Sequence, residues 1–395
     1  MTPHGVRLLV LTTSYPSRSN PASGVFVRRL LDHLPASFLP TVVTPETDRA
    51  NAFHRDKGIR VQPFGYAPRR LQVLAHQPGG LPGVFKNKFG YLVLLPGLLA
   101  AAVLMLLRLA RRSDLIHAQW APCGVIAGLV GALMHRPVIT TVRGTDLDWA
   151  GRSVFFRLAL RFCLHLNQRV VTVSRGMARQ LTVWFPWYRH KIHHIPNGVA
   201  LPEKGVDVRR STIPFLVAVI GNLIPDKRVD VVIRAFQALV RSVTGARLLV
   251  AGGGPERKRL ETLVCRSGLQ PRVSFLGVLQ PDDVRKLLQA CHALVLASAK
   301  EGRPNIVLEA MAAGTPVVAA DIKPVREIIG QNERGLLFPL DDVEQLTLRL
   351  RYLSEDAAAG PKMAQQAFTW LEKQGLTWQK TAAAYSVIYR QVLAK

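Results

Sequence analysis

Short apolar segments that alternate with helical segments are the feature that most constrains the fold of this 395-residue chain. In the first half the pattern predicts strands at Val6–Thr12, 115–117, Val138–Val142 and Val170–Val173. The second half repeats it, with strands at Phe215–Ile220, Arg247–Ala251, 273–276, 293–296 and 316–319. Strands that are separated by helices of this length pair in parallel. The chain is therefore predicted to be an α/β protein with two doubly wound, Rossmann-like domains.

The domain boundaries follow from a polar, charged segment at 201–212, which is predicted to be a linker. We expect one domain at 1–205, a second at 206–375, and a C-terminal helix at 376–395 that packs back on the first domain. Ligands bind at the carboxyl ends of parallel strands in such sheets. The two domains are therefore expected to face each other across a cleft that holds the substrates.

The net charge is +26 and is uneven, because residues 1–200 hold 25 Lys and Arg against 7 Asp and Glu. Such a field attracts polyanions, either anionic lipid surfaces or nucleic acid. The segment Tyr91–Leu107 is almost wholly apolar, but it is shorter than a usual membrane span and contains Pro96 and Gly97. A buried or interface-lying helix is expected there, and the protein is expected to attach peripherally to a membrane.

The cysteines and the N-terminus indicate the compartment. The four cysteines are widely spaced and form no C-x-x-C pair, so a disulfide framework or a zinc site is not expected. The first residues lack the apolar length of a signal peptide and are predicted to begin a strand. A cytoplasmic protein on the inner face of the plasma membrane is the localisation that these features favour.

The segment 301–318 contains the strongest functional motif, because two carboxylates bracket a loop and the start of a helix. Asn305 is predicted to cap this helix, so that the following N–H groups can accept an anion. Glu309 is expected in its first turn, where it could accept hydrogen bonds from a ribose diol. Glu301 could face hydroxyl groups at the other end of the same ligand. The arrangement suits a nucleotide diphosphate sugar.

This segment resembles the E-x7-E signature of family-four glycosyltransferases, which are retaining enzymes with the GT-B fold. The resemblance implies that Glu309 binds ribose, that Glu301 contacts the donor sugar, and that the amides of Asn305 and Ile306 add hydrogen bonds. It also implies that the first domain binds the acceptor and the second binds the donor. No metal and no cofactor other than the donor substrate are expected, because cationic side chains and helix ends can stabilise the leaving group.

The segment Gly221–Lys227 follows a predicted strand and resembles the family's Gly-Arg-Leu-x-x-x-Lys. Lys227 matches the lysine that holds the diphosphate, whereas Asn222 stands in place of the arginine. Asn222 can donate a hydrogen bond but brings no charge, and the neighbouring Arg228 could supply the missing one. Leu279 follows another strand and matches the family segment whose backbone meets the nucleobase.

Three further positions in the first half are candidate site residues. Gly24 precedes a helix, and in the family this loop lies against the diphosphate. His117 lies in a segment that resembles the family's D-x-x-H-x-H. Arg143 replaces the histidine of the family's H-G-x-D. An arginine cannot act as a base near neutral pH but can pair with a phosphate or carboxylate. This substitution points to an anionic acceptor, whereas His117 fits a catalytic and a structural role equally well.

The sequence as a whole predicts a retaining glycosyltransferase that moves a sugar from a nucleotide diphosphate sugar to a glycan or lipid-linked acceptor. Synthesis of cell-surface polysaccharide or glycolipid fits the basic first half. Another GT-B activity, such as a nucleotide-sugar epimerase or a phosphorylase, is the alternative within the enzymes. A basic nucleic-acid-binding protein on an inactive transferase fold is the alternative from another class, although no nucleic-acid-binding module is recognisable.

Overall fold

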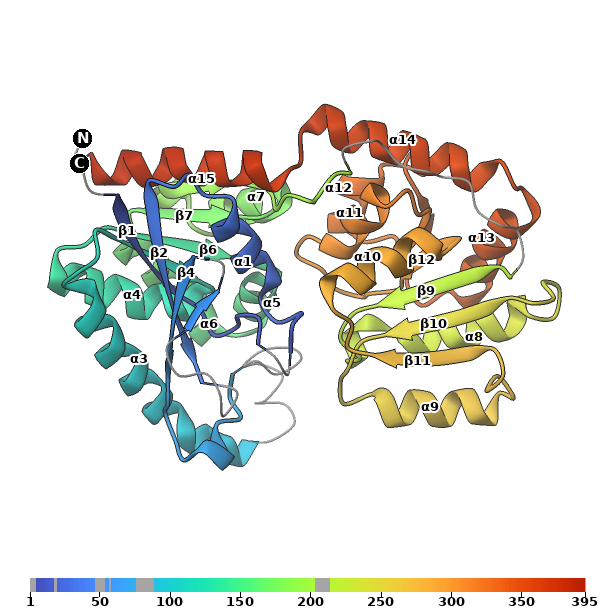
Figure 1. Ribbon diagram of the computed structural model, residues 1–395, viewed down its shortest axis with the longest axis horizontal. Coiled ribbons are helices and arrows are strands. Elements are labelled where there is room, and N and C mark those ends of the chain that lie inside the picture. Colours follow the sequence, from blue (N-terminus) through green and yellow to red (C-terminus); the bar gives the residue numbers. More distant parts are fainter. Residues whose placement is uncertain are drawn as a thin grey trace. The chain divides into compact units, whose positions relative to one another are not determined.

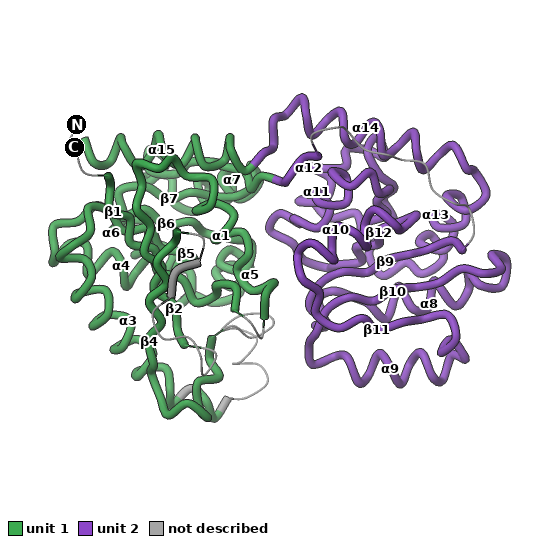
Figure 2. The backbone as a smooth tube through the Cα atoms, in the orientation of Figure 1, with its two compact units in different colours: residues 1–198, 378–395 green, residues 199–377 purple. Residues whose placement is uncertain are grey.

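The computed structural model describes residues 5–17, 20–46, 54–56, 58–75, 89–202 and 214–394. They form two compact units, which Figure 2 shows in separate colours. Unit 1 comprises 1–198 together with 378–395, and unit 2 comprises 199–377. The chain thus returns to unit 1 for its last helix. The boundary predicted at 205–206 lies outside the described residues.

The described strands of unit 1 form one sheet in the order β3-β4-β2-β1-β5-β6-β7-β8. All its pairings are parallel except that of β3 with β4. The strands are β1 (Val6–Leu11), β2 (Phe38–Pro45), β3 (His54–Asp56), β4 (Ile59–Phe64), β5 (Leu115–Gln119), β6 (Val138–Val142), β7 (Arg169–Thr172) and β8 (Ile192–His194). Without β3 the order is that of a dinucleotide-binding fold, which reverses between β1 and β5.

The helices of unit 1 cover both faces of this sheet (Figure 1). They are α1 (Val25–Asp32), η1 (Arg69–Leu71), η2 (Phe89–Leu94), α3 (Leu95–Ala110), α4 (Ala121–Met134), α5 (Gly144–Arg152), α6 (Val154–Leu166), α7 (Arg175–Trp184), η3 (Pro186–Lys191) and α15 (Trp378–Leu393). On one face α3 and α4 pack over Leu9 and Ile116, and on the other α1 and α15 pack over Leu8 and Val10. Both faces of the central strands are therefore buried, which explains their continuous apolar sequences.

Unit 2 contains one sheet in the order β11-β10-β9-β12-β13-β14, and every pairing in it is parallel. The strands are β9 (Leu216–Ile220), β10 (Arg247–Ala251), β11 (Val273–Gly277), β12 (Ala293–Leu296), β13 (Val317–Ala320) and β14 (Leu336–Phe338). This is the Rossmann order, in which the direction of winding reverses between β9 and β12. The predicted fold of two parallel-sheet α/β domains is confirmed.

The helices of unit 2 alternate with these strands as the sequence pattern predicts. They are η4 (Pro225–Lys227), α8 (Val229–Leu239), α9 (Arg257–Arg266), α10 (Pro281–Ala290), α11 (Asn305–Ala312), α12 (Lys323–Ile329), α13 (Val343–Glu355) and α14 (Ala359–Gln374). Two apolar cores lie on opposite faces of the sheet, one under α8 and α13 and the other under α11 and α14. Ligand loops in such a sheet follow the strands on either side of the reversal.

The apolar segment Tyr91–Leu107 forms the end of η2 and most of α3. Leu98, Ala102 and Leu106 of α3 are buried in the core of unit 1, so the helix belongs to the folded domain. Among the described helices, none combines the length and the hydropathy that crossing a bilayer requires.

Candidate active site

Tight loops at the carboxyl ends of β9 and β10 form the base of the candidate donor site in unit 2. The amide of Gly221 donates to the carbonyl of Ala251, and the amide of Leu223 donates to the carbonyl of Gly253, each at 2.9 Å. Gly252 has φ 141°, and a Cβ there would lie 1.8 Å from the carbonyl oxygen of Gly221. Only glycine allows this approach, which fixes the two loops against each other.

The loops that follow β9 and β12 meet at the point where the strand order reverses. Nζ of Lys227 lies 2.5 Å from Oε1 of Glu301. The amide of Ala299 donates to the carbonyl of Asp226 at 2.8 Å, so backbone and side chains both join the loops. The Glu301 side chain is 13% exposed and that of Lys227 25%, so both groups still reach the surface. The structure thus brings together the two residues that the sequence places in separate motifs.

The start of α11 differs from the prediction at two positions. Pro304, with extended backbone angles, occupies the N-cap, and Asn305 is the first residue of the helix. Asn305 is therefore not the cap, and no side chain caps this end. Glu309 is the fifth residue of α11 and lies in its second turn instead of its first. The helix begins one residue away from the prediction because an N-cap residue needs a non-helical backbone, and the extended angles of Pro304 provide it.

The two positions that depart from the family's lysine loop also have defined places. Asn222 is exposed, directly after Gly221. Arg228 has a left-handed backbone at φ 50° and precedes α8, where its Nε lies 3.1 Å from Oδ1 of Asp341. The charge of Arg228 is thus already paired in unit 2. This pairing directs Arg228 toward Asp341, and the replacement of the missing arginine by Arg228 stays a prediction.

The remaining predicted donor contacts, Ile306 and Leu279, are both half-buried in unit 2. Ile306 is the second residue of α11, so its amide belongs to the unpaired first turn. Leu279 follows Gly277 at the end of β11, two strands from the reversal point. A cavity of about 300 Å³ opens beyond the ends of β13 and β14, and none of the predicted site residues lines it.

Arg303, two residues after Glu301, is a charged group that the sequence analysis did not single out. Burial lowers the pKa of its guanidinium to about 10, and the negative charge of Glu327 partly opposes this shift. Its Nε is buried and has no hydrogen-bond partner among the described residues. The signal available in the sequence was a cation between the two carboxylates of the motif, Glu301 and Glu309.

In unit 1, Gly24 and Arg143 lie where two helices begin. Gly24 is the N-cap of α1 with φ 61°, and a Cβ there would lie 2.1 Å from the carbonyl oxygen of Ser14. Arg143 is the N-cap of α5, and its guanidinium lies 3.6 Å from the ring centroid of Phe26, the second residue of α1. This stacking holds a planar cation against the helix that Gly24 starts.

Arg143 is half-buried, and its guanidinium forms no ion pair with a carboxylate among the described residues. Its Nη2 donates to Oε1 of Gln119 at 2.9 Å, whereas Nε is buried without a partner among the described residues. Burial lowers the pKa of Arg143 to about 10, so it remains a cation at neutral pH. The carboxylate of the neighbouring acid, Asp146, accepts hydrogen bonds from the backbone amides of Arg143 and Ala121. Burial raises the pKa of Asp146 to about 6.

His117 lies in the interior of unit 1 instead of at its surface. It is 0% exposed, and its Nδ1 lies 2.7 Å from the hydroxyl oxygen of Tyr389 on α15. Its Nε2 lies 2.8 Å from Oγ1 of Thr141 and 3.1 Å from Nε2 of Gln119. Burial, and next the charge of Arg143, lower its pKa to about 3. The predicted catalytic role is not supported by this placement, because both ring nitrogens are engaged inside the domain.

These contacts assign one tautomer to His117. Arg143 donates to Oε1 of Gln119, so the amide nitrogen of Gln119 faces His117 and donates to Nε2. The ring proton is therefore on Nδ1, where it donates to Tyr389. The chain of contacts links α15 to Arg143 through neutral groups, which gives His117 a positioning role.

With respect to metals, the described residues contain no group of three or more His, Cys, Asp or Glu side chains arranged to hold an ion.

Comparisons with known proteins agree with this architecture. Residues 23–202 match the family model described as Glycosyltransferase Family 4, and residues 206–370 match Glycosyl transferases group 1. The N-acetyl-alpha-D-glucosaminyl L-malate synthase of Bacillus anthracis is 26% identical over 294 residues, which cover 71% of this chain and 75% of that protein.

Solved structures with the same fold cover almost the whole chain. Sucrose-phosphate synthase from Thermosynechococcus elongatus superposes with a TM-score of 0.77 at 20% identity, covering 98% of this chain and 99% of that one. Anabaena HepE in complex with UDP-glucose gives 0.72 at 18% identity, covering 98% and 99%. Two Rossmann-like domains of these types define the GT-B class. The chain is a glycosyltransferase, an enzyme of the EC 2.4 class.

Proposed function

We propose that this glycosyltransferase takes its sugar from a nucleotide diphosphate sugar and transfers it with retention of configuration. The acceptor is a glycan or a lipid-linked glycan, in the synthesis of cell-surface polysaccharide or glycolipid. The observation that carries the proposal is the contact between Lys227 and Glu301 at the reversal point of the unit 2 sheet. HepE, which has the same fold, binds UDP-glucose, and this supports the choice of donor.

Lys227 and Glu301 bind different parts of the donor. The ammonium group of Lys227 has three N–H donors, and one of them meets Glu301. The others are directed to the diphosphate, whose charge rises as the glycosidic bond breaks. Glu301 retains acceptor capacity for hydroxyl groups of the sugar. Because each residue orients the other, the pair holds the leaving group and the sugar in one geometry.

The first turn of α11 adds to the donor site. The amides of Asn305 and Ile306 belong to the first turn of α11, where the positive end of the helix dipole favours a phosphate. Glu309 accepts hydrogen bonds from the ribose hydroxyls one turn further along. Backbone at Gly24 and Leu279 completes the contacts, to the diphosphate and to the nucleobase. With this set of cations and amides, we expect activity to persist in the presence of a chelator.

The acceptor carries an anionic group that pairs with Arg143. The guanidinium of Arg143 is partly desolvated and has no carboxylate partner among the described residues, and a bound anion would compensate this cost. Arginine binds phosphate and carboxylate through two parallel hydrogen bonds, and Nε of Arg143 is one of the donors available. The name of the Bacillus relative contains L-malate, a dicarboxylate, which supports an anionic acceptor. A lipid-linked acceptor at the inner face of the plasma membrane also fits, with the protein held there peripherally.

The donor is tested by a thermal-shift screen with nucleotide sugars that differ in base and sugar. We expect one donor to raise the unfolding temperature of the wild type and to lose most of this effect with Glu309→Ala. Loss of a carboxylate–hydroxyl contact corresponds to about 1.5–3 kcal/mol. Stabilisation of both proteins to the same extent would rule out the ribose role of Glu309.

The reaction is tested by product analysis with that donor. The anomeric configuration of the product, determined by NMR, distinguishes retention from inversion. A glycosyl phosphate formed in the presence of inorganic phosphate would indicate a phosphorylase, and an altered donor would indicate an epimerase. Charged acceptors are then compared with neutral analogues. We expect Arg143→Gln to raise KM only for the charged ones, and an equal rise for both would contradict the anionic acceptor.

A further inference from the structure

The outer helix layer of unit 1 has an unusual surface. α4 packs between α3 and α6, and the inner sides of the three helices cover one face of the sheet. Leu106 of α3, Val130 of α4 and Leu164 of α6 are buried in this way. In an ordinary α/β domain the outward sides of such helices carry charged and polar residues. Here they do not.

Large apolar side chains point outward from all three helices. Leu104 on α3 is 67% exposed, Leu133 on α4 is 67% exposed, and Phe155 on α6 is 83% exposed. α4 contains no charged residue along its whole length from Ala121 to Met134. Single exposed apolar residues are common, but a set shared by adjacent helices marks an interaction site. The full set is Leu99, Leu104, Leu129, Leu133, Val154, Phe155, Leu158 and Phe162, which we name the outer apolar face.

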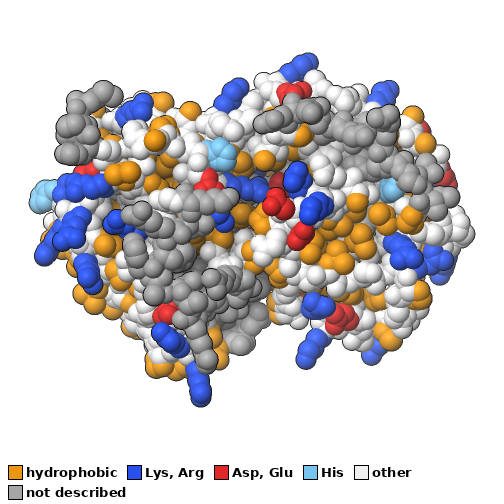
Figure 3. Space-filling model, in the orientation of Figure 1, with side chains coloured by type: hydrophobic (Ala, Val, Ile, Leu, Met, Phe, Trp, Pro, Cys, Tyr) orange, Lys and Arg blue, Asp and Glu red, His pale blue; other side chains and the backbone are white. Residues whose placement is uncertain are grey.

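The charges around the outer apolar face have one sign. None of the three helices contains an Asp or a Glu, and residues 149–200 contain none either. Exposed arginines border the face at Arg108, Arg111, Arg112 and Arg161. Basic and hydrophobic side chains also lie side by side along the left edge of the molecule in Figure 3.

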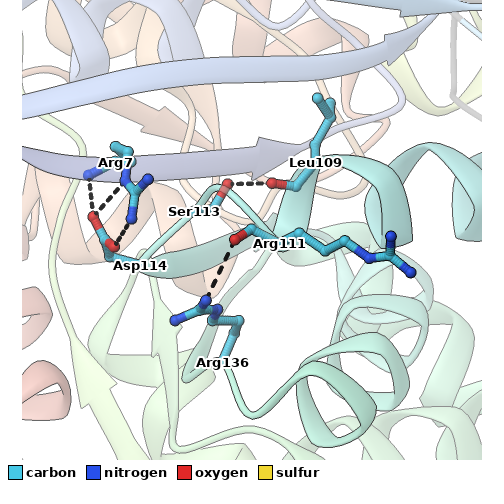
Figure 4. A network of polar contacts seen from close by, with 6 residues as sticks. All are labelled: Arg7, Leu109, Arg111, Ser113, Asp114 and Arg136. Atoms are coloured by element: carbon cyan, nitrogen blue, oxygen red, sulfur yellow. Dashed lines mark hydrogen bonds and ion pairs between the residues drawn. The ribbon is translucent and has the colours of Figure 1, made fainter.

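The nearest acid does not neutralise these arginines. Asp114, which follows α3, pairs with Arg7 at 2.6 Å, and this pairing lowers the pKa of its carboxyl group (Figure 4). Arg136 donates to the carbonyl of Arg111 at 3.4 Å, so it keeps its charge (Figure 4). The side chain of Arg111 extends away from this network in the same view. Within the described part of the chain, Arg108, Arg111, Arg112 and Arg161 form no ion pair with an acid.

We propose that the outer apolar face is the surface by which this protein binds a bilayer that contains anionic lipid. Apolar side chains enter the boundary between headgroups and acyl chains, and the bordering arginines meet the anionic headgroups. The proposal rests on the membrane attachment proposed above and gives it a location. It does not depend on the donor or the acceptor, so its test is separate from the test of transfer.

Two other binding partners, nucleic acid and a second copy of this chain, fit the outer apolar face less well. Nucleic acid would need cations at the centre of the surface, whereas the centre here consists of aliphatic leucines. A second copy of this chain would bring its own arginines against these, and like charges across an interface are unfavourable. A bilayer with anionic headgroups satisfies both the apolar centre and the basic border.

The test is co-sedimentation of the full chain with vesicles of phosphatidylcholine alone or mixed with phosphatidylglycerol. We expect binding only to the anionic vesicles and weaker binding at high salt. The variant Leu104→Ser, Leu133→Ser, Phe162→Ser is expected to reduce the affinity by at least about tenfold. Its matched control, Leu348→Ser with Tyr352→Ser, changes exposed apolar residues of α13 in unit 2 and is expected to bind like the wild type.

A second variant separates charge from apolar contact. Arg108→Gln, Arg111→Gln, Arg161→Gln is expected to reduce the affinity on the order of 100-fold at low salt, at roughly fivefold per arginine. All these residues are exposed, so circular dichroism and thermal melting are expected to match the wild type. Equal binding by the wild type and either variant would overturn the proposal, as would failure of the wild type to bind anionic vesicles. A dimer lost in the apolar variant, or nucleic-acid binding lost in it, would assign the face to that occupant instead.

Discussion

Lys227 shows how one residue can carry most of the charge of a site. Asn222 supplies no charge and Arg228 is paired with Asp341, so in the proposed donor site this loop offers the diphosphate a single lysine. We expect Lys227→Ala to lower kcat/KM by roughly 10- to 100-fold, from the loss of about 1.5–3 kcal/mol of charge-assisted bonding. Arg228→Ala is the matched control and is expected to leave kcat/KM within about twofold. A comparable loss in both variants would show that Arg228 leaves Asp341 when the donor binds.

His117 is expected to make stability depend on pH. Its pKa is about 3 in the folded chain and about 6.5 when unfolded, so below 6.5 the unfolded chain binds the extra proton. Its contribution to stability is therefore full above pH 6.5 and falls by about 2 kcal/mol at pH 5. Asp146, with a raised pKa, acts in the opposite direction, because its folded form is protonated first.

The His117 contribution is isolated by comparing the wild type with His117→Gln, since Asp146 is present in both. Denaturant unfolding at pH 8 and pH 5 gives the two free-energy differences. We expect the variant to be less stable than the wild type at pH 8, and we expect this difference in unfolding free energy to be smaller at pH 5. A gap that stays constant would mean that His117 titrates normally inside the fold.

At the level of single residues, the sequence indicated which residue types could form the site, but it did not indicate how buried they are or what they contact. The acids at 301 and 309 and the lysine at 227 were found because their types and spacing are visible in the sequence. The burial of His117 was not, because it depends on Tyr389, which is 272 positions away. Arg303 was missed for a similar reason, since its low exposure arises from packing after β12 and its nearest acid is on α12.

Among the elements, the strand-end loops of unit 2 are the most sensitive to change. We expect Gly252→Ala to destabilise unit 2 by roughly 1–3 kcal/mol, because its backbone is outside the range of L residues and Cβ meets the carbonyl of Gly221. Donor affinity should fall as well, since the Gly221 loop must move. Thermal unfolding and donor titration give the two values.

Gly268→Ala is the matched control for this change. It also has a positive φ, 66°, but a Cβ there meets nothing within 4 Å. A small loss of stability with unchanged donor affinity is expected. Equal effects of the two substitutions on donor affinity would show that the close approach at Gly252 does not matter.

The prediction of strands failed where proline in the local sequence disfavours a strand but the folded domain contains one. β2 and β4 were not predicted, because β2 contains Pro40 and Pro45 and β4 contains Pro63. Proline is rare inside a sheet, yet β2 pairs with both β1 and β4. The cap of α11 was misplaced by one residue for the same reason, since proline was not considered as a helix start. Strand β14 (Leu336–Phe338) was also missed although it contains no proline, because it has only three residues.

For the whole molecule, the last helix completes the core of unit 1. Trp378, Tyr385 and Tyr389 of α15 are buried against the sheet face that α1 also covers. We expect truncation after Thr377 to lower the stability of unit 1 by more than about 5 kcal/mol, since several large side chains are removed. Hydrogen exchange measured by mass spectrometry should then show loss of protection in β1 and β5, whereas β9 and β12 keep theirs. Protection lost equally in both units would contradict the division into separate cores.

The return of the chain to unit 1 also has a consequence for its synthesis. α15 is made only after residues 199–377, so the part of the unit 1 sheet face that α15 covers is still open while all of unit 2 leaves the ribosome. At about 5–20 residues per second, this interval lasts on the order of ten seconds to half a minute. The nascent first domain thus exposes this apolar surface until α15 has been synthesised. Unit 2 can therefore fold before the core of unit 1 is complete. Chaperone dependence during translation should be concentrated in that interval.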